Sequence, residues 1–288
     1  MKNRILLSML ALSCGLLAVT AASGAPGGPV LKPFADADHV IYAPIRGAIA
    51  PKARVTLLTN HGGGVLVSAK LVFIFWGASF ANAASPDHAY ATTLQAFRNQ
   101  YGTTPEYNVI TQYSGIQLTN LGSGTADWFD TSAPPTNVTD ATVQAEVNRY
   151  LAGHGAFDAS TIYEVVTPSS SYSSSGSSTS CGGPHLAYCA YHGSYTGASG
   201  TVIYSIQPYP SCSGCKVTGW SDVQNQEHFV CHETRESVTD PVNAWWDGRT
   251  GEEADDKCAW SPAPFIGTGG YAYQYEWSNA ARACVRTQ

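Results

Sequence analysis

The hydrophobic positions of the chain fall into short continuous runs and into stripes at helical spacing. Residues 70–76 (KLVFIFW) form an apolar run of strand length, which predicts a central strand buried on both faces. Residues 107–113, 161–166 and 201–207 are predicted as further strands. Helical stripes separate these runs, so the pattern predicts alternating strands and helices.

Capping signals mark the first two helices. Ser85 can cap the first, Pro86 suits its first turn, and apolar side chains recur at helical spacing as far as Tyr101. Asp140 is predicted to cap the second helix, whose apolar stripe ends near Gly153.

This alternation predicts one α/β domain over residues 51–288, with a mixed central sheet and flanking helices. A third helix is expected over residues 222–240, because Pro241 disfavours helix in the residue before it. Residues 26–50 are rich in Pro, Gly and Ala and are predicted to form an extended N-terminal arm. The Ser-rich residues 168–180 look too polar to pack and are predicted to form a mobile surface loop.

The N-terminus has the pattern of a secretory signal peptide. Lys2 and Arg4 precede an apolar run over residues 5–22, and small residues follow up to Ala25. We therefore expect residues 1–25 to be removed and the protein to be secreted, with the periplasm as the alternative compartment. The formal net charge is −6, which argues against nucleic acid and anionic membranes as partners.

Eight cysteines are present, and one of them lies in the predicted signal peptide. Disulfides are the default for the others in an oxidising compartment. Local pairing is predicted, with Cys231 left unpaired and buried. The three predicted pairs are Cys181–Cys189, Cys212–Cys215 and Cys258–Cys284.

The third predicted helix carries a metal-binding pattern. In the common zinc helix H-E-x-x-H, two imidazoles share one face and the intervening Glu activates water. Here the pattern is His232-Glu233-x-x-Glu236, and a carboxylate can bind zinc at much the same distance as an imidazole. We predict His232 and Glu236 as ligands of Zn²⁺, or of another divalent ion, and Glu233 as the general base.

A catalytic metal needs a third ligand. In the thermolysin-like arrangement this is a carboxylate roughly twenty residues beyond the second helix ligand. That spacing favours Asp256, with Glu253 and Glu252 as alternatives in the same acidic segment.

Three further histidines are candidate members of the site. His228 lies one turn before His232 on the same helix face, while His192 and His61 stand beside glycines. The competing interpretation of each is a hydrogen-bonded structural histidine.

Several short motifs resemble the EXORDIUM, or phosphate-induced protein, family of secreted proteins. These are NHGGGVL from Asn60, the strand end FWG at Gly77, YCAYHGS from Tyr188, and the Cys212-Ser-Gly-Cys215 pair. The resemblance covers residues 55–284. It implies an extracellular protein linked to growth control, without a firmly implied enzymatic activity.

Within that resemblance, the chain is similar to a bacterial-type branch that carries His-Glu-x-x-Glu. The branch pattern Gly-x-Glu-x-x-Asp-x-Cys matches Glu253 and Asp256, which makes Glu252 the weaker candidate.

The sequence therefore predicts a secreted metal-dependent hydrolase, and specifically a zinc peptidase acting on extracellular peptides or proteins. A non-catalytic EXORDIUM-like binding or growth factor is one alternative. A glycoside hydrolase using paired carboxylates is the other.

Overall fold

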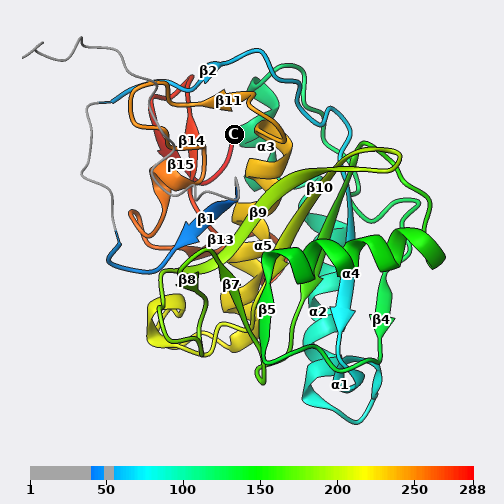
Figure 1. The fold of residues 1–288 in the computed structure, drawn as a ribbon. Helices are drawn as coiled ribbons and strands as arrows, with labels where there is room; N and C mark the ends of the chain where they lie inside the picture. The colour runs from blue at the N-terminus through cyan, green and yellow to red at the C-terminus, as the bar shows by residue number, and fades with distance from the viewer. Residues whose placement is uncertain (1–39, 49–54) are drawn as a thin grey trace, which may run out of the picture.

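A computed structural model describes residues 40–48 and 55–288 (Figure 1). The predicted signal peptide and much of the predicted N-terminal arm lie outside these ranges. The centre of the fold is a six-stranded mixed sheet in the order β1-β9-β10-β6-β3-β4. Its strands are β1 (Ile41–Pro44), β3 (Lys70–Trp76), β4 (Trp128–Asp130), β6 (Thr161–Val166), β9 (Tyr188–Gly197) and β10 (Gly200–Gln207).

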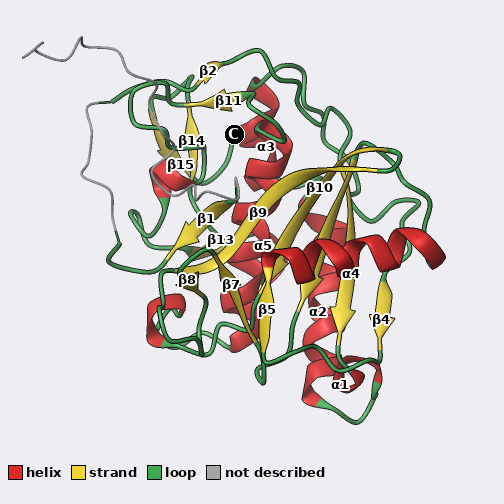
Figure 2. Ribbon diagram, in the orientation of Figure 1, coloured by secondary structure: helices red, strands yellow, loops and turns green. Residues whose placement is uncertain are grey.

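Four neighbouring strands, β4, β3, β6 and β10, are parallel, whereas β9 is antiparallel to both β10 and β1. Helices cover both faces of this sheet, and Figure 2 shows α4 (Asp140–Gly153) across one face. Helices α2 (Pro86–Tyr101) and α5 (Asp222–Thr239) contribute to the core on the other face. The predicted α/β fold with a mixed central sheet and flanking helices is confirmed.

Strand β3 explains why the run of residues 70–76 has no polar alternation. Successive side chains of a strand point to opposite faces, and here both faces are covered. Leu71, Phe73 and Phe75 belong to the core shared with α2 and α5. Val72, Ile74 and Trp76 belong to the core shared with α4.

The helix boundaries follow the capping chemistry. Ser85 caps α2 by accepting from the backbone N–H of Asp87, as predicted. The cap of α4 is Thr139 rather than Asp140, which is the first residue inside the helix. Helix α5 begins with a capping box of Ser221 and Gln224 and ends at the predicted place.

Two predicted segments differ from the structure. Residues 107–113 are not a strand, because Thr104 caps a short helix, α3 (Pro105–Asn108), which continues as a 3₁₀ turn, η1 (Val109–Gln112). The Ser-rich residues 168–180 contain β7 (Tyr172–Ser175) and β8 (Ser178–Thr179), which join β5 (Asn137–Thr139) in a small sheet. Ser173 and Ser180 are buried there because their polar groups bond to each other and to Tyr188.

Part of the predicted N-terminal arm is also ordered as β1, which forms the edge of the central sheet. The remaining elements are short and lie mainly towards the C-terminal half of the chain. They are α1 (Ala78–Ala81), β2 (Thr59–Asn60), η2 (Ser213–Cys215), β11 (Trp245–Trp246), η3 (Asp256–Cys258), β12 (Phe265–Ile266), η4 (Thr268–Gly270), β13 (Ala272–Tyr273), β14 (Glu276–Ser278) and β15 (Ala283–Val285).

Three disulfides are formed among residues 40–48 and 55–288, and two of them differ from the predicted pairing. Cys181 bonds to Cys212 and Cys189 bonds to Cys215, so the predicted pairs Cys181–Cys189 and Cys212–Cys215 are wrong. Cys215 of η2 meets Cys189 of β9 because η2 lies against that strand, and Cys212, just before η2, meets Cys181 in the segment that precedes β9. The pair Cys258–Cys284 and the unpaired, buried Cys231 are confirmed.

Three disulfides are typical of a protein from an oxidising compartment. Within residues 40–48 and 55–288, none of the helices has the length and apolar character required to cross a bilayer.

Candidate metal site

The site is built on α5, whose residues from Asn225 to Thr239 are all buried. One face of α5 lies against β9, β10 and β1 of the sheet, while β13 of the C-terminal segment also packs on the helix. At the end of α5, Asp240 accepts a hydrogen bond from the backbone N–H of Ala244 and turns the chain back. The acidic segment that follows thereby returns to the helix.

Three buried atoms converge beside the helix. His232 Nε2 lies 3.1 Å from Glu236 Oε2 and 3.7 Å from Asp256 Oδ1. None of these three atoms makes a hydrogen bond of normal geometry within the described ranges. They are therefore buried polar atoms, two of them facing His232 Nε2, and native structures rarely leave such atoms unsatisfied.

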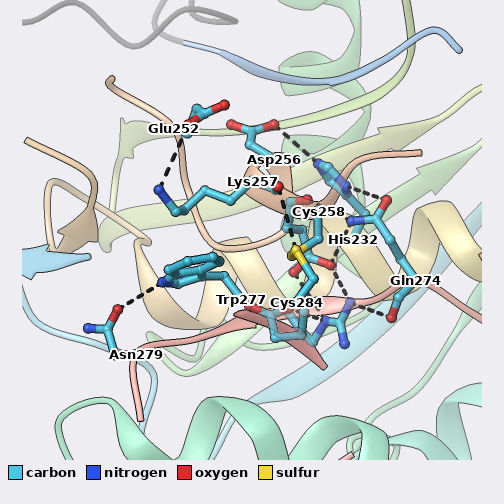
Figure 3. The surroundings of a disulfide bond; sticks show 12 residues. His232, Glu252, Asp256, Lys257, Cys258, Gln274, Trp277, Asn279 and Cys284 are labelled. Carbon is cyan, nitrogen blue, oxygen red and sulfur yellow. Dashed lines mark hydrogen bonds and ion pairs between the residues drawn. A yellow bond between two sulfur atoms is a disulfide. The ribbon is translucent and has the colours of Figure 1, made fainter. Parts of the chain in front are cut away.

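The second polar atom of each of these side chains has its own partner. His232 Nδ1 lies 3.2 Å from Gln274 Oε1, and Figure 3 shows the imidazole between Gln274 and Asp256. Glu236 Oε1 accepts from the backbone N–H of Asp256 at 2.9 Å. Asp256 Oδ2 accepts from the backbone N–H of Glu253 at 3.2 Å. These contacts orient the three converging atoms, as outer partners orient metal ligands.

His192 of β9 brings a second set of contacts to the same place. Its Nδ1 lies 2.9 Å from Glu233 Oε2 and 3.8 Å from Glu236 Oε2. Its Nε2 lies 3.5 Å from Glu253 Oε2. His192, Glu236 and Glu253 have ligand atoms that all lie within 4.8 Å of one another, as do those of His232, Glu233 and Glu236. Glu236 belongs to both of these groups, and Asp256 approaches the second through His232.

Burial and like charge dominate the electrostatics of the site. Burial raises the pKa of Glu233 well above its ordinary value, and the neighbouring Glu236 and Asp256 raise it further. Burial and Glu236 likewise raise the pKa of Asp256. Burial acts to lower the pKa of His232, but Glu236 and Glu233 outweigh it and raise that pKa. Four carboxyl groups face two imidazoles here, so acidic groups outnumber basic groups in the site.

A fully buried ion network holds the acidic segment in place. Arg235 pairs with Asp255, and its Nε lies 2.7 Å from Glu276 Oε2. Gln274 donates to the backbone carbonyl of Asp255 at 2.8 Å. Sequence reasoning missed Arg235, Asp255, Gln274 and Glu276, and no motif marks the last two.

The other candidate residues lie outside this cluster. The ring of His228 packs on Phe229 and Trp260, and burial lowers its pKa to about 3. His61 stacks on Trp246 with ring centroids 3.7 Å apart, where β2 pairs with β11. Glu252 accepts a hydrogen bond from Thr250 at 2.8 Å. His192, Glu253 and Asp256 are the predicted candidates that reach the α5 motif.

Glu164 of β6 contacts α5, and its raised pKa should make the stability of the protein depend on pH. Thr234 donates to it at 3.0 Å, and burial raises its pKa from 4.5 to about 8. The folded state therefore holds a proton that the unfolded state releases, so stability falls as pH rises from about 4.5 to 8. Glu164→Gln should remove this loss.

We expect Glu164→Gln to match the wild type near pH 5 and to be more stable near pH 8, as measured by urea unfolding in the presence of a chelator. The chelator keeps metal binding from contributing to the difference. Two stability profiles that stay parallel across this range would contradict the prediction.

No family model matches the chain, and no curated protein or solved structure matches it either.

Proposed function

We propose that the protein is a metal-dependent hydrolase, most specifically a zinc peptidase, with α5 as a zincin-like active-site helix. The observation that carries the proposal is the convergence of His232 Nε2, Glu236 Oε2 and Asp256 Oδ1. Tetrahedral coordination at about 2.1 Å places neighbouring ligand atoms about 3.4 Å apart. The two separations from His232 Nε2, 3.1 Å to Glu236 Oε2 and 3.7 Å to Asp256 Oδ1, bracket that value.

The donor set suits zinc and also admits harder divalent ions. Imidazole and carboxylate groups both bind zinc, and three protein ligands leave a further position open. The extra carboxylate makes this set harder than one with two imidazoles, which favours oxygen-seeking ions more than usual. A divalent cation would also balance the excess of buried carboxyl groups, since buried charges otherwise require partners.

In this proposal Asp256 is the third ligand, and Glu253 lies beside it with His192. Asp256 is favoured because its Oδ2 is already held by a backbone N–H while Oδ1 faces His232. Glu253 remains the alternative ligand, through the cluster that it forms with His192 and Glu236.

Glu233 is the proposed general base. A bound zinc ion would supply Lewis acidity and make water more acidic. Glu233 would accept a proton from the attacking water and donate one to the leaving amine nitrogen. The oxygen of the water joins the carbonyl carbon, and the amide C–N bond breaks. His192 would hold the Glu233 carboxyl in place through the 2.9 Å contact.

A peptide is favoured over a sugar because the carboxyl of Glu233 already contacts a backbone N–H, that of Ala43 in β1. Glycoside hydrolysis would instead need two carboxyl groups facing each other across the substrate. The EXORDIUM resemblance supports the other alternative, an extracellular binding factor. That alternative predicts that His232→Ala leaves the fold and the biological effect intact.

The proposal is tested by the metal content of protein purified without added metal. We expect about one zinc or other divalent ion per chain in the wild type, and less than about a tenth of that in His232→Ala. His61→Ala serves as the matched control, because His61 lies apart from the cluster, and it should keep the ion. Wild-type protein that is folded and carries no divalent ion would overturn the proposal.

A further inference from the structure

Strand β1 lies directly beside the proposed site. It pairs antiparallel with β9, so that Ile41 faces His192, Tyr42 faces Tyr191 and Ala43 faces Ala190. The strand is at the edge of the sheet and is nevertheless buried, with Ala43 only 1% exposed. An extended chain segment thus covers the stretch of β9 that contributes His192.

The backbone of β1 reaches the proposed general base. The N–H of Ala43 donates to Glu233 Oε1 at 3.2 Å. Because N–H groups along a strand alternate in direction, that of Tyr42 points towards β9. Glu233 Oε2 meanwhile faces His192. Both carboxyl oxygens are therefore engaged while β1 is in place, and β1 occupies the space beside the proposed general base.

The side chains of β1 occupy two different environments. The Tyr42 ring stacks on Tyr188 with centroids 4.6 Å apart and an interplanar angle of 1°. Ala43 lies on the opposite face with Phe229 and the Cys189–Cys215 disulfide. In strand addition to a sheet edge, main-chain hydrogen bonds provide affinity and pockets for alternate side chains provide specificity.

We propose that β1 is a self-inhibitory strand in the peptide-binding site of the enzyme. The substrate is an extended peptide that pairs with β9 in place of β1, with an aromatic side chain stacked on Tyr188 followed by a small residue. This inference rests on the proposed peptidase function. It adds the substrate class, the edge on which the substrate binds and the reason why the intact chain is latent.

A binding experiment with two proline variants tests the proposal. The probe is a fluorescein-labelled peptide with the sequence of residues 40–46 (VIYAPIR). Tyr42→Pro removes an N–H that points to β9, whereas Ile41→Pro removes one that points away. We expect Tyr42→Pro to bind the probe at least about tenfold more tightly than the wild type or Ile41→Pro. Folded Tyr42→Pro that binds no better than the wild type overturns the proposal.

Hydrogen exchange of the wild type decides the question if Tyr42→Pro does not fold. A displaceable strand opens without global unfolding, so amides of residues 41–43 should exchange at least about tenfold faster than those of β3. Equal exchange in β1 and β3 would overturn the proposal. Neither measurement needs a metal. Absence of a divalent ion from the purified protein would therefore contradict the proposed peptidase function alone. If the protein binds the ion but gives the contrary result in both measurements, only the proposal of a self-inhibitory strand is wrong.

Discussion

Replacing Glu233 by Gln is expected to reduce peptide hydrolysis by about a hundred- to ten-thousandfold while the metal stays bound. The amide keeps the size of the carboxyl group but cannot accept a proton from water. The loss should appear as lower kcat, because proton transfer is needed in the transition state rather than for binding. Hydrolysis of fluorescein-labelled casein would be measured with Glu233→Gln in two backgrounds, the wild type and Tyr42→Pro.

The matched control for this variant is Glu252→Gln. Glu252 is near the acidic residues of the site in sequence, but its carboxyl group pairs with Thr250 rather than with the converging atoms. We expect Glu252→Gln to retain both activity and metal. Equal activity of Tyr42→Pro with and without Glu233→Gln, with metal content unchanged, would show that Glu233 is not the base.

Much of the fold could be predicted where one local signal is strong. The apolar run of β3 is long because both faces of the strand are covered, and the Ser85–Pro86 signal fixes the start of α2. The prediction failed where tertiary contacts satisfy polar groups. Ser173 is a polar residue of the Ser-rich segment, yet its side chain is buried, because its hydroxyl forms a hydrogen bond with the hydroxyl of Tyr188. Nothing in the local sequence indicates that partner.

The candidate site, too, could be predicted only in the part that depends on local sequence. Helical spacing places His232 and Glu236 on one face of α5 from sequence alone. The approach of His192 depends on how β9 lies against α5, which requires the whole sheet. The choice between Glu253 and Asp256 depends on which backbone N–H groups hold each carboxyl group, and sequence spacing does not determine this.

The ion network behind the site should be essential for stability. Arg235 is completely buried and holds two buried carboxyl groups, those of Asp255 and Glu276. Arg235→Met would leave both without their positive partner, and breaking a buried pair in this way typically costs about 3–5 kcal/mol. We expect a loss of this size in the free energy of unfolding, measured with urea. Because Asp255 adjoins Asp256, metal content should fall as well.

Arg149→Met is the control for the loss of an arginine as such. Arg149 also pairs with two buried carboxyl groups, Glu146 and Asp130, but its own side chain is 49% exposed, so solvent screens these pairs more than those of Arg235. Arg149→Met should therefore lose clearly less stability than Arg235→Met. Adding Asp255→Asn and Glu276→Gln to Arg235→Met should recover stability, because no buried carboxyl group is then left unpaired. If Arg235→Met alone were as stable as Arg149→Met, the network would not be what holds the acidic segment against α5.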